Sequence, residues 1–234
     1  MKLEAGIKMA ERYGDIPEKF TKAWWEYFWE YYKWYVIVPL IIIIAIGTTI
    51  YGKLTAPKYD LTLTYAANNI IESENEEILT SNLSKLCDDV DENGEKSLFF
   101  TQLWIKDNPS QGDIEYARAS ATKLQLSFAE DQKYIYIMDN EAAQLYIGQL
   151  KDECPYAPIE SWAKNIPEGT EIFSAHGVNY GISLAGNKLF EGYGIDLSDH
   201  YLIMRYYPRK DQMKKQLKGY EAAVNLANRI ITEK

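Results

Sequence analysis

The sequence predicts an α/β fold class: an N-terminal aromatic interfacial helix and one transmembrane helix, followed by a single three-layer α/β lobe with a mostly parallel sheet. Two observations predict it. Nineteen consecutive residues, Trp34 to Gly52, carry no charge. After residue 60, strand-like and helix-like segments alternate along the chain. We therefore expect four parts, with boundaries at 1–23, 24–52, 53–59 and 60–234.

The uncharged run has the length and composition of a membrane span. At about 1.5 Å per residue, a helix of this length covers most of the ~30 Å hydrocarbon core of a bilayer. Its Ile-rich sequence shows no period of two or of 3.6, which is typical of a helix surrounded by lipid. A buried core helix is the alternative, but the rest of the chain is too polar to cover it. Pro39 falls in the first turns, where a missing amide hydrogen bond costs least.

The segment before this run is unusually aromatic, with nine Trp, Tyr or Phe among the twelve residues 24–35. In a helix the charged residues would share one face, because they recur every three or four positions: Lys19, Lys22, Glu26, Glu30 and Lys33. Trp and Tyr side chains favour the headgroup level of a bilayer. We therefore expect a membrane interface at Trp24, Trp25, Trp29, Tyr32 and Trp34. A docking surface for a partner membrane protein is a second interpretation, and both can hold.

Charge indicates the orientation and excludes one class of partner. Three lysines (19, 22 and 33) precede the span closely and two (53 and 58) follow it. The positive-inside rule then places the N-terminus in the cytoplasm, as in an uncleaved, single-pass signal anchor, and residues 60–234 outside the cell. Residues 34–234 hold 19 basic and 28 acidic groups, which argues against nucleic acid as a partner.

Residues 60–139 read as three strands separated by two helices. A serine oxygen at Ser73 and the carboxyl of Glu76 have the spacing of a capping box. Asp139 directly follows the apolar run YIYIM and could cap a short helix after it. This order predicts parallel strands with right-handed crossovers. The expected strands are 61–66, 97–105 and 134–138, the expected helices are 71–90 and 114–128, and a later strand 201–207 precedes a final helix that includes 213–231.

Two segments carry a resemblance to a known family. The stretch KLQLSFAEDQKYIYIMD (123–139) and the segment VNYGISL (178–184) resemble the first lobe of type 2 periplasmic substrate-binding proteins. The resemblance covers roughly 60–207, although Glu130 and Asp131 stand where glycine is usual and Ser183 replaces a proline. It implies a solute-binding ancestry, but the second lobe that would close on a ligand is missing. The anchor with Tyr32-Lys33-Trp34 is similar to membrane proteins of Gram-positive anaerobic bacteria.

Few residues suggest chemistry, and we expect no enzyme. Asp139 follows a central strand at the edge where open α/β sheets bind ligands. Trp104 and Tyr180 could offer stacking surfaces, so these three residues form the candidate ligand site. His176 and His200 lack metal-like or triad-like neighbours and read as loop residues.

The segment from Asp89 to Gly94 matches the start of a calcium loop, with candidate oxygen ligands at Asp89, Asp91 and Asn93. Its twelfth position is Phe100, where a bidentate glutamate is needed. A solvated turn is the alternative, so calcium stands as a possible ligand and no other cofactor is expected.

Cys87 and Cys154 could form one bridge or remain two free thiols. These observations favour a membrane-anchored, non-catalytic interaction module, with the lipid bilayer and a membrane protein as partners. A ligand sensor or transport accessory that binds a small solute is the alternative.

Overall fold

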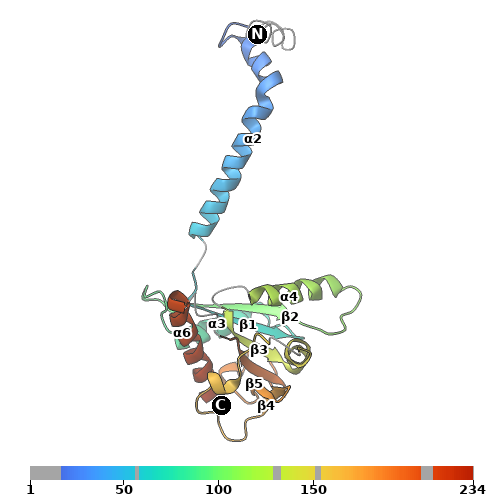
Figure 1. Ribbon diagram of the computed structural model, residues 1–234, viewed down its shortest axis with the longest axis vertical. Coiled ribbons are helices and arrows are strands. Elements are labelled where there is room, and N and C mark those ends of the chain that lie inside the picture. Colours follow the sequence, from blue (N-terminus) through green and yellow to red (C-terminus); the bar gives the residue numbers. More distant parts are fainter. Residues whose placement is uncertain (1–16, 56–57, 129–132, 151–153, 207–212, 234) are drawn as a thin grey trace. The chain divides into compact units, whose positions relative to one another are not determined.

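The structure, a computed structural model, describes residues 17–55, 58–128, 133–150, 154–206 and 213–233. The chain divides into two compact units, residues 1–57 and 58–234, which are described separately (Figure 1). Most of the expected N-terminal segment 1–23 lies outside the described residues.

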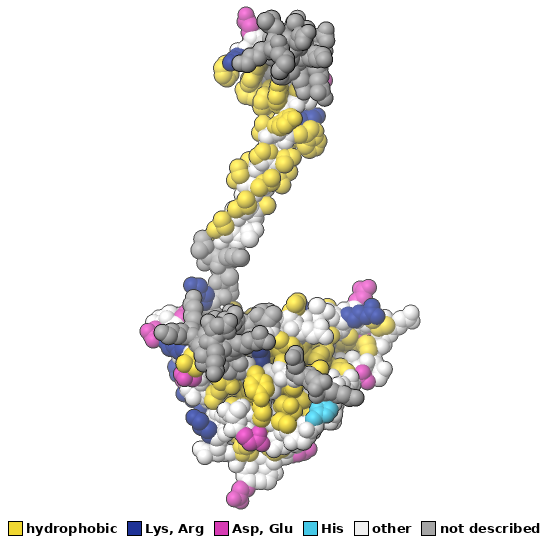
Figure 2. Space-filling view, in the orientation of Figure 1, with side chains coloured by type: hydrophobic (Ala, Val, Ile, Leu, Met, Phe, Trp, Pro, Cys, Tyr) yellow, Lys and Arg dark blue, Asp and Glu magenta, His cyan; other side chains and the backbone are white. Residues whose placement is uncertain are grey.

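The first unit is one helix, α2, which runs without interruption from Lys22 to Thr55 over 34 residues. The expected aromatic interfacial helix and the expected transmembrane helix are therefore parts of a single helix. No glycine and no proline separates the two parts, so nothing in the sequence ends the first one. Among the described residues it is the helix that is long and apolar enough to cross a membrane. Figure 2 shows hydrophobic side chains along its length and charged ones towards its N-terminal part.

The second unit is built on a six-stranded sheet with the order β2-β1-β3-β6-β5-β4. Four of the strands, β1, β2, β3 and β6, lie close to the expected strands, whereas β4 and β5 were not expected as strands. Their bounds are β1 Leu61–Ala67, β2 Leu98–Trp104, β3 Lys133–Asp139, β4 Ile172–Ala175, β5 Val178–Ser183 and β6 His200–Met204.

The sheet is mixed, so the expectation of a mostly parallel sheet is not confirmed. β1 pairs in parallel with β2 and with β3, as the strand–helix order predicts. β6 runs antiparallel to β3 and to β5, and β4 and β5 form an antiparallel hairpin. The segment 178–184 therefore adds a strand to the same sheet instead of leading into a second lobe.

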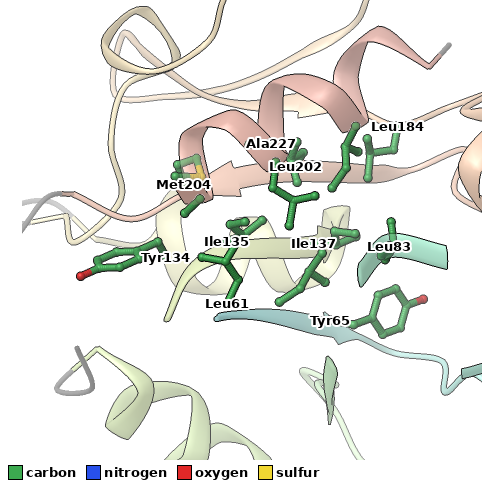
Figure 3. Packing of buried hydrophobic residues seen from close by; sticks show 14 of the residues in the cluster. Leu61, Tyr65, Leu83, Tyr134, Ile135, Ile137, Leu184, Leu202, Met204 and Ala227 are labelled. Carbon is green, nitrogen blue, oxygen red and sulfur yellow. The ribbon is translucent and has the colours of Figure 1, made fainter. Parts of the chain in front are cut away.

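Helices cover both faces of the sheet and make three layers (Figure 1). Leucines of α3 and the apolar face of α6 pack in one core cluster with β1, β3 and β6 (Figure 3). Side chains of α4, α5 and the following π-helix form the second cluster on the other face. The bounds are α3 Ser73–Leu86, α4 Ile114–Ser127, α5 Asn140–Ala143, the π-helix η1 Gln144–Gly148 and α6 Met213–Thr232, with single-turn 3₁₀ helices at Ile159–Ser161 and Lys188–Phe190.

The alternation of side chains explains why β3 reads as an unbroken apolar run. Ile135 and Ile137 belong to the cluster beside α3 and α6, whereas Tyr136 and Met138 belong to the cluster beside α4 and α5. Successive side chains of a strand point to opposite faces, so a strand covered on both sides must be apolar at every position.

The start of α3 differs from the predicted capping box. The residue before the helix is Glu72, and its side chain makes no capping hydrogen bond. The Gln102 amide on β2 supplies an anchor instead: its oxygen accepts from the Ile71 N–H (2.7 Å), and its nitrogen donates to the Ile71 carbonyl (3.0 Å) and to Glu76 (2.6 Å). A side chain distant in sequence thus anchors the chain where α3 begins.

Two glycines should respond to alanine in opposite directions. A Cβ at Gly181 in β5 would lie 2.9 Å from Tyr201 Cβ and 3.1 Å from Phe173 Cβ, so Gly181→Ala forces the strands apart. Gly219 in α6 has open space around it, and Gly219→Ala should stabilise the helix by about 0.5–1 kcal/mol. Urea unfolding of the full-length chain in detergent measures both. Equal midpoints for the two variants would contradict this packing.

Candidate functional site

Asp139 ends β3 and is almost completely buried, with 1% of its surface exposed. Its Oδ1 accepts from the Ala142 N–H (2.8 Å), which confirms the predicted cap of α5. Its Oδ2 accepts from the Asn68 N–H just after β1 (2.7 Å). One carboxyl group therefore begins a helix and ties the ends of two neighbouring strands together.

Burial raises the pKa of Asp139, and the hydrogen bonds from Ala142 and Asn68 oppose this effect without cancelling it. Both oxygens already accept backbone N–H groups, and the side chain has almost no contact with solvent. The structure thus gives the strongest polar candidate of the sequence a structural role at the switch point between β1 and β3.

Trp104 lies beside Asp139 at the same end of the sheet and shares a partner with it. Trp104 pairs with Ala67 of β1, and Met138, the residue before Asp139, pairs with Ala66. The Trp104 Nε1–H donates to the Asn68 carbonyl (2.8 Å). Glu141 of α5 connects the loops after β1 and β2. Its carboxylate accepts from the Asp107 N–H (2.7 Å) and from the Asn68 side-chain amide (3.3 Å). Hydrogen bonds therefore hold together the loops after β1, β2 and β3.

Tyr180 does not join this group. The next residue, Gly181, pairs with Ile203 of β6. Ile203 in turn pairs with Tyr136, near the start of β3. Tyr180 thus lies towards the opposite end of the sheet from Asp139. Burial, together with a hydrogen bond involving Cys154, raises the pKa of Tyr180 to about 12. The structure brings two of the three candidate ligand residues together and leaves the third apart.

The sequence missed a buried polar chain around His200. The expectation of a loop residue is wrong, because His200 opens β6, pairs with Asp139 in the register and is 2% exposed. Its Nε2 lies 3.0 Å from the Tyr65 hydroxyl, and its Nδ1 lies 2.8 Å from Asp199 Oδ1. The Tyr65 hydroxyl also donates to Asn69 Oδ1 (2.5 Å). No local sequence pattern predicts the contact between Tyr65 and His200, because the two residues are 135 positions apart.

Burial shifts the pKa values of both ring side chains in this buried group. Burial lowers the pKa of His200, with the carboxylates of Asp199 and Asp139 opposing the shift. Burial also raises the pKa of Tyr65, and Asp139 and Asp199 add to that effect. A buried tyrosine that keeps its proton is a poor nucleophile at neutral pH. We interpret the group as a hydrogen-bonded support for the ends of β1 and β6.

The candidate calcium loop gains one carboxylate that the sequence did not indicate. Oxygens of Asp60, Asp89 and Asp91 all lie within 4.8 Å of one another. The predicted ligands accept hydrogen bonds from the loop itself: Asp89 from Asn93 and Gly94, Asp91 from Asn93, and Asn93 from Glu95. Phe100, at the twelfth position, is a buried residue of β2, and its side chain has no oxygen to offer as a ligand.

Asp60 fastens this loop to the sheet. Its Oδ1 accepts from the Val90 N–H (2.7 Å) and the Asp91 N–H (3.2 Å), and its Oδ2 accepts from the Ser97 N–H and hydroxyl (both 2.9 Å). Burial raises the pKa of Asp60, but these hydrogen bonds together outweigh it and lower the pKa overall. Hydrogen bonds that span 37 residues, as from Asp60 to Ser97, have no short-range signal in the sequence.

The two cysteines are free thiols. Cys87 is buried in the cluster beside α3 and α6, and Cys154 packs against the cluster on the other face of the sheet. Burial raises the pKa of Cys87 to about 12. Of the two alternatives left open by the sequence, the structure has the unbridged one.

Comparison with known proteins adds no relative. No protein-family model, no curated protein and no solved structure matches the chain. The resemblance to type 2 periplasmic substrate-binding proteins therefore stays a prediction from the residues, and nothing in the α/β sheet ties the chain to that family.

Replacement of Asp60 should weaken the domain and change how acid affects it. Folding lowers the pKa of Asp60, so the ionised carboxylate stabilises the fold at pH values above its ordinary pKa of 3.8. This stability is lost as the pH falls through the lower pKa of the folded state. Asp60→Asn should therefore unfold at lower urea at pH 7 and lose less stability between pH 5 and 3 than the parent. Asp113→Asn, at an exposed carboxyl that accepts from Ser110, is the control. A parent-like midpoint at pH 7 would contradict the role given to Asp60.

Calcium should leave the thermal midpoint of the domain unchanged. The oxygens of Asp60 and Asp89 accept N–H groups, so an ion would have to displace hydrogen bonds that already hold the loop. The test compares melting of the full-length chain with excess chelator and with excess CaCl₂. A higher midpoint with calcium, abolished in Asp89→Asn, would show that the loop rearranges into a calcium site.

Proposed function

We propose that the chain is a single-pass, membrane-anchored interaction module, with its N-terminus in the cytoplasm and its α/β domain outside the cell. Helix α2 is the observation that carries the proposal. Among the described residues, no other segment of the first unit covers four isoleucines of this helix, whose exposed fractions are 52–65%: Ile41, Ile42, Ile43 and Ile44. Lipid is the solvent that such a surface requires.

The length of α2 favours a protein partner as well as lipid. At about 1.5 Å per residue its 34 residues span about 51 Å, whereas a bilayer with its headgroup layers is about 40–45 Å thick. When the uncharged run fills the hydrocarbon core, the first turns of the helix extend beyond the headgroups. Trp25 and Trp29, one turn apart and more than half exposed, then need another apolar surface to cover them.

The rings of this segment are ordered along the helix. Trp24 stacks on Phe28 (5.4 Å between centroids), and Phe28 stacks on Tyr32 (5.8 Å). Trp25 contacts Trp24 and Phe28 edge-on. Stacked rings hold one another in place, so these side chains of α2 lose little conformational entropy when a partner binds. This rigidity favours a docking surface made of aromatic side chains.

A ligand sensor remains the second candidate because of one feature of the domain. A cavity of about 410 Å³ lies between the loop after β2, the start of α4 and the π-helix η1. Ile105, Ala117 and Leu145 line it, together with Lys106 and Arg118. Its volume is that of a small-molecule site, and π-helical turns often occur at functional sites.

Photocrosslinking of the full-length chain in its native membrane tests the proposal. A photoreactive residue at position 25 or 29 should capture the same protein reproducibly, and one at position 43 should capture lipid, because the two parts of α2 lie in different surroundings. Trp25→Ala with Trp29→Ala should abolish co-purification of that protein, and Leu126→Ala, at an exposed apolar residue of α4, should not.

Two results would overturn the proposal: release of the chain from membranes by alkaline carbonate, or capture of no protein at either tryptophan. Capture of no protein together with a higher melting midpoint in the presence of one solute would favour the sensor.

A further inference from the structure

β2 forms one edge of the sheet and leaves half of its backbone groups unpaired. The Ser97 carbonyl accepts from the N–H groups of Asp60 and Leu61, and the Ile105 N–H donates to the Ala67 carbonyl. The backbone N–H and C=O groups of the odd-numbered residues therefore point towards β1. Successive residues of a strand alternate, so the N–H and C=O groups of the even-numbered residues point away from the sheet. These residues are Leu98, Phe100, Gln102 and Trp104. Within the described ranges, no hydrogen bond from another segment reaches those backbone groups.

The two edges of the sheet differ in how they are protected. β4, at the far edge, has four residues and an irregular register between Phe173 and Ser174, and short or bulged edges resist pairing. β2 has seven residues in unbroken register with β1. Its sequence, LFFTQLW, holds no charge, no proline and no glycine. It therefore lacks the short length, the irregular register, the charged residues and the proline that protect many edge strands.

Apolar side chains border this unprotected edge. Phe99 is 41% exposed and stacks on Tyr59, which is 36% exposed, with 5.0 Å between the ring centroids. Tyr59 and Phe99 are among the residues that line a groove of about 390 Å³ between β2 and α3. The hydroxyl of Thr101, at the middle of the strand, is buried and has no hydrogen-bond partner among the described residues.

We propose that β2 pairs with β2 of a second copy of this chain, antiparallel and about a two-fold axis at Thr101, to join two sheets into one. This inference does not depend on the membrane anchor. It concerns a different surface from the aromatic part of α2.

The sequence of β2 is compatible with antiparallel pairing between two copies of the strand. With the axis at Thr101 all seven residues overlap, and the outward groups of Phe100 and Leu98 meet those of Gln102 and Trp104 of the partner subunit. On one face Phe99 then lies opposite Leu103 of the partner subunit, and the second sheet removes the Phe99 ring from the open edge. The two Thr101 side chains lie opposite each other, where a χ1 rotation lets threonine hydroxyls bond across the strands. No charge occurs in the strand, so no like charges are opposed within it, and a two-fold contact closes at two copies.

Site-specific crosslinking tests the register. Thr101 occupies a position without hydrogen bonds to the second copy, where opposed Cβ atoms are about 4.5–5.5 Å apart and close to the range of a disulfide. In the full-length chain carrying Cys154→Ser, Thr101→Cys should give a disulfide-linked dimer under mild oxidation. Thr122→Cys, at an exposed site on α4, is the control and should stay monomeric.

A charge on the edge tests the pairing without oxidation. Phe99→Lys should raise the dissociation constant of the dimer about tenfold or more in detergent, because the axis repeats the lost contact twice and lysine protects edge strands. Leu126→Lys places the same charge on an exposed apolar residue of α4 and should leave the dimer intact. Light scattering over a dilution series measures both, and melting shows that both variants remain folded.

Three results would overturn the inference: a monomeric parent chain, a Thr101→Cys dimer no more abundant than the Thr122→Cys control, or a dimer that Phe99→Lys leaves unchanged. The last result would indicate self-association through another surface, such as α2. The proposed docking of α2 would survive each of these failures, since its test records a different protein captured at Trp25 and Trp29.

Discussion

Burial of the central strands on both faces determines how the rest of the domain is built. Every residue of β1 and of β6 is buried, and so are six of the seven residues of β3. Water cannot reach their peptide groups, so each N–H and C=O must find a partner within the sheet. Apolar side chains on both faces also require helices on both sides, which α3 and α6 supply on one face and α4 and α5 on the other.

The same requirement continues at the ends of these strands. Where β1 and β3 stop, the Asn68 N–H and the first turn of α5 would be left without acceptors, and the buried carboxyl of Asp139 satisfies both. Where β1 begins, Asp60 does the same for the loop from Asp89 to Gly94 and for Ser97. Burial raises the pKa of each carboxyl group, and the hydrogen bonds that it accepts lower the pKa. Their pKa values move in opposite directions because Asp60 accepts more hydrogen bonds than Asp139 and is less deeply buried.

Local patterns were sufficient for most elements of the fold. The apolar run of β3, the stripe of α4 and the cap at Asp139 depend on residues within a few positions of one another, and each was predicted close to its observed place. β4 was missed because it has four residues. Its signal is the two-residue turn after it, His176-Gly177, in which both residues have positive φ angles (52° and 77°), as in the tight turn of a hairpin.

The candidate site was less predictable than the fold because it depends on distant contacts. Asp139 was found from its position after a strand, but its burial follows from Asn68, which is 71 residues away. His200 was expected in a loop because its neighbours form no metal-like or triad-like pattern, and the contact of its Nε2 with the Tyr65 hydroxyl joins residues 135 positions apart. Tyr180 was grouped with Asp139 as a possible stacking surface for a ligand. The antiparallel order of β6 and β5 places it near the other end of the sheet.

The position of Pro39 within the continuous helix α2 bears on where the proposed membrane surface would lie. Pro39 lies inside the helix and cannot donate the hydrogen bond that the Tyr35 carbonyl would otherwise accept. In the hydrocarbon core an unpaired carbonyl is costly, whereas at the headgroup level water can reach it. Tyr35 is also the last residue of the aromatic segment, before the run of aliphatic side chains begins. In the proposed membrane-anchored arrangement, a bilayer surface at this level would let water reach the Tyr35 carbonyl and would suit the neighbouring Trp and Tyr rings, so that proline is tolerated within the helix.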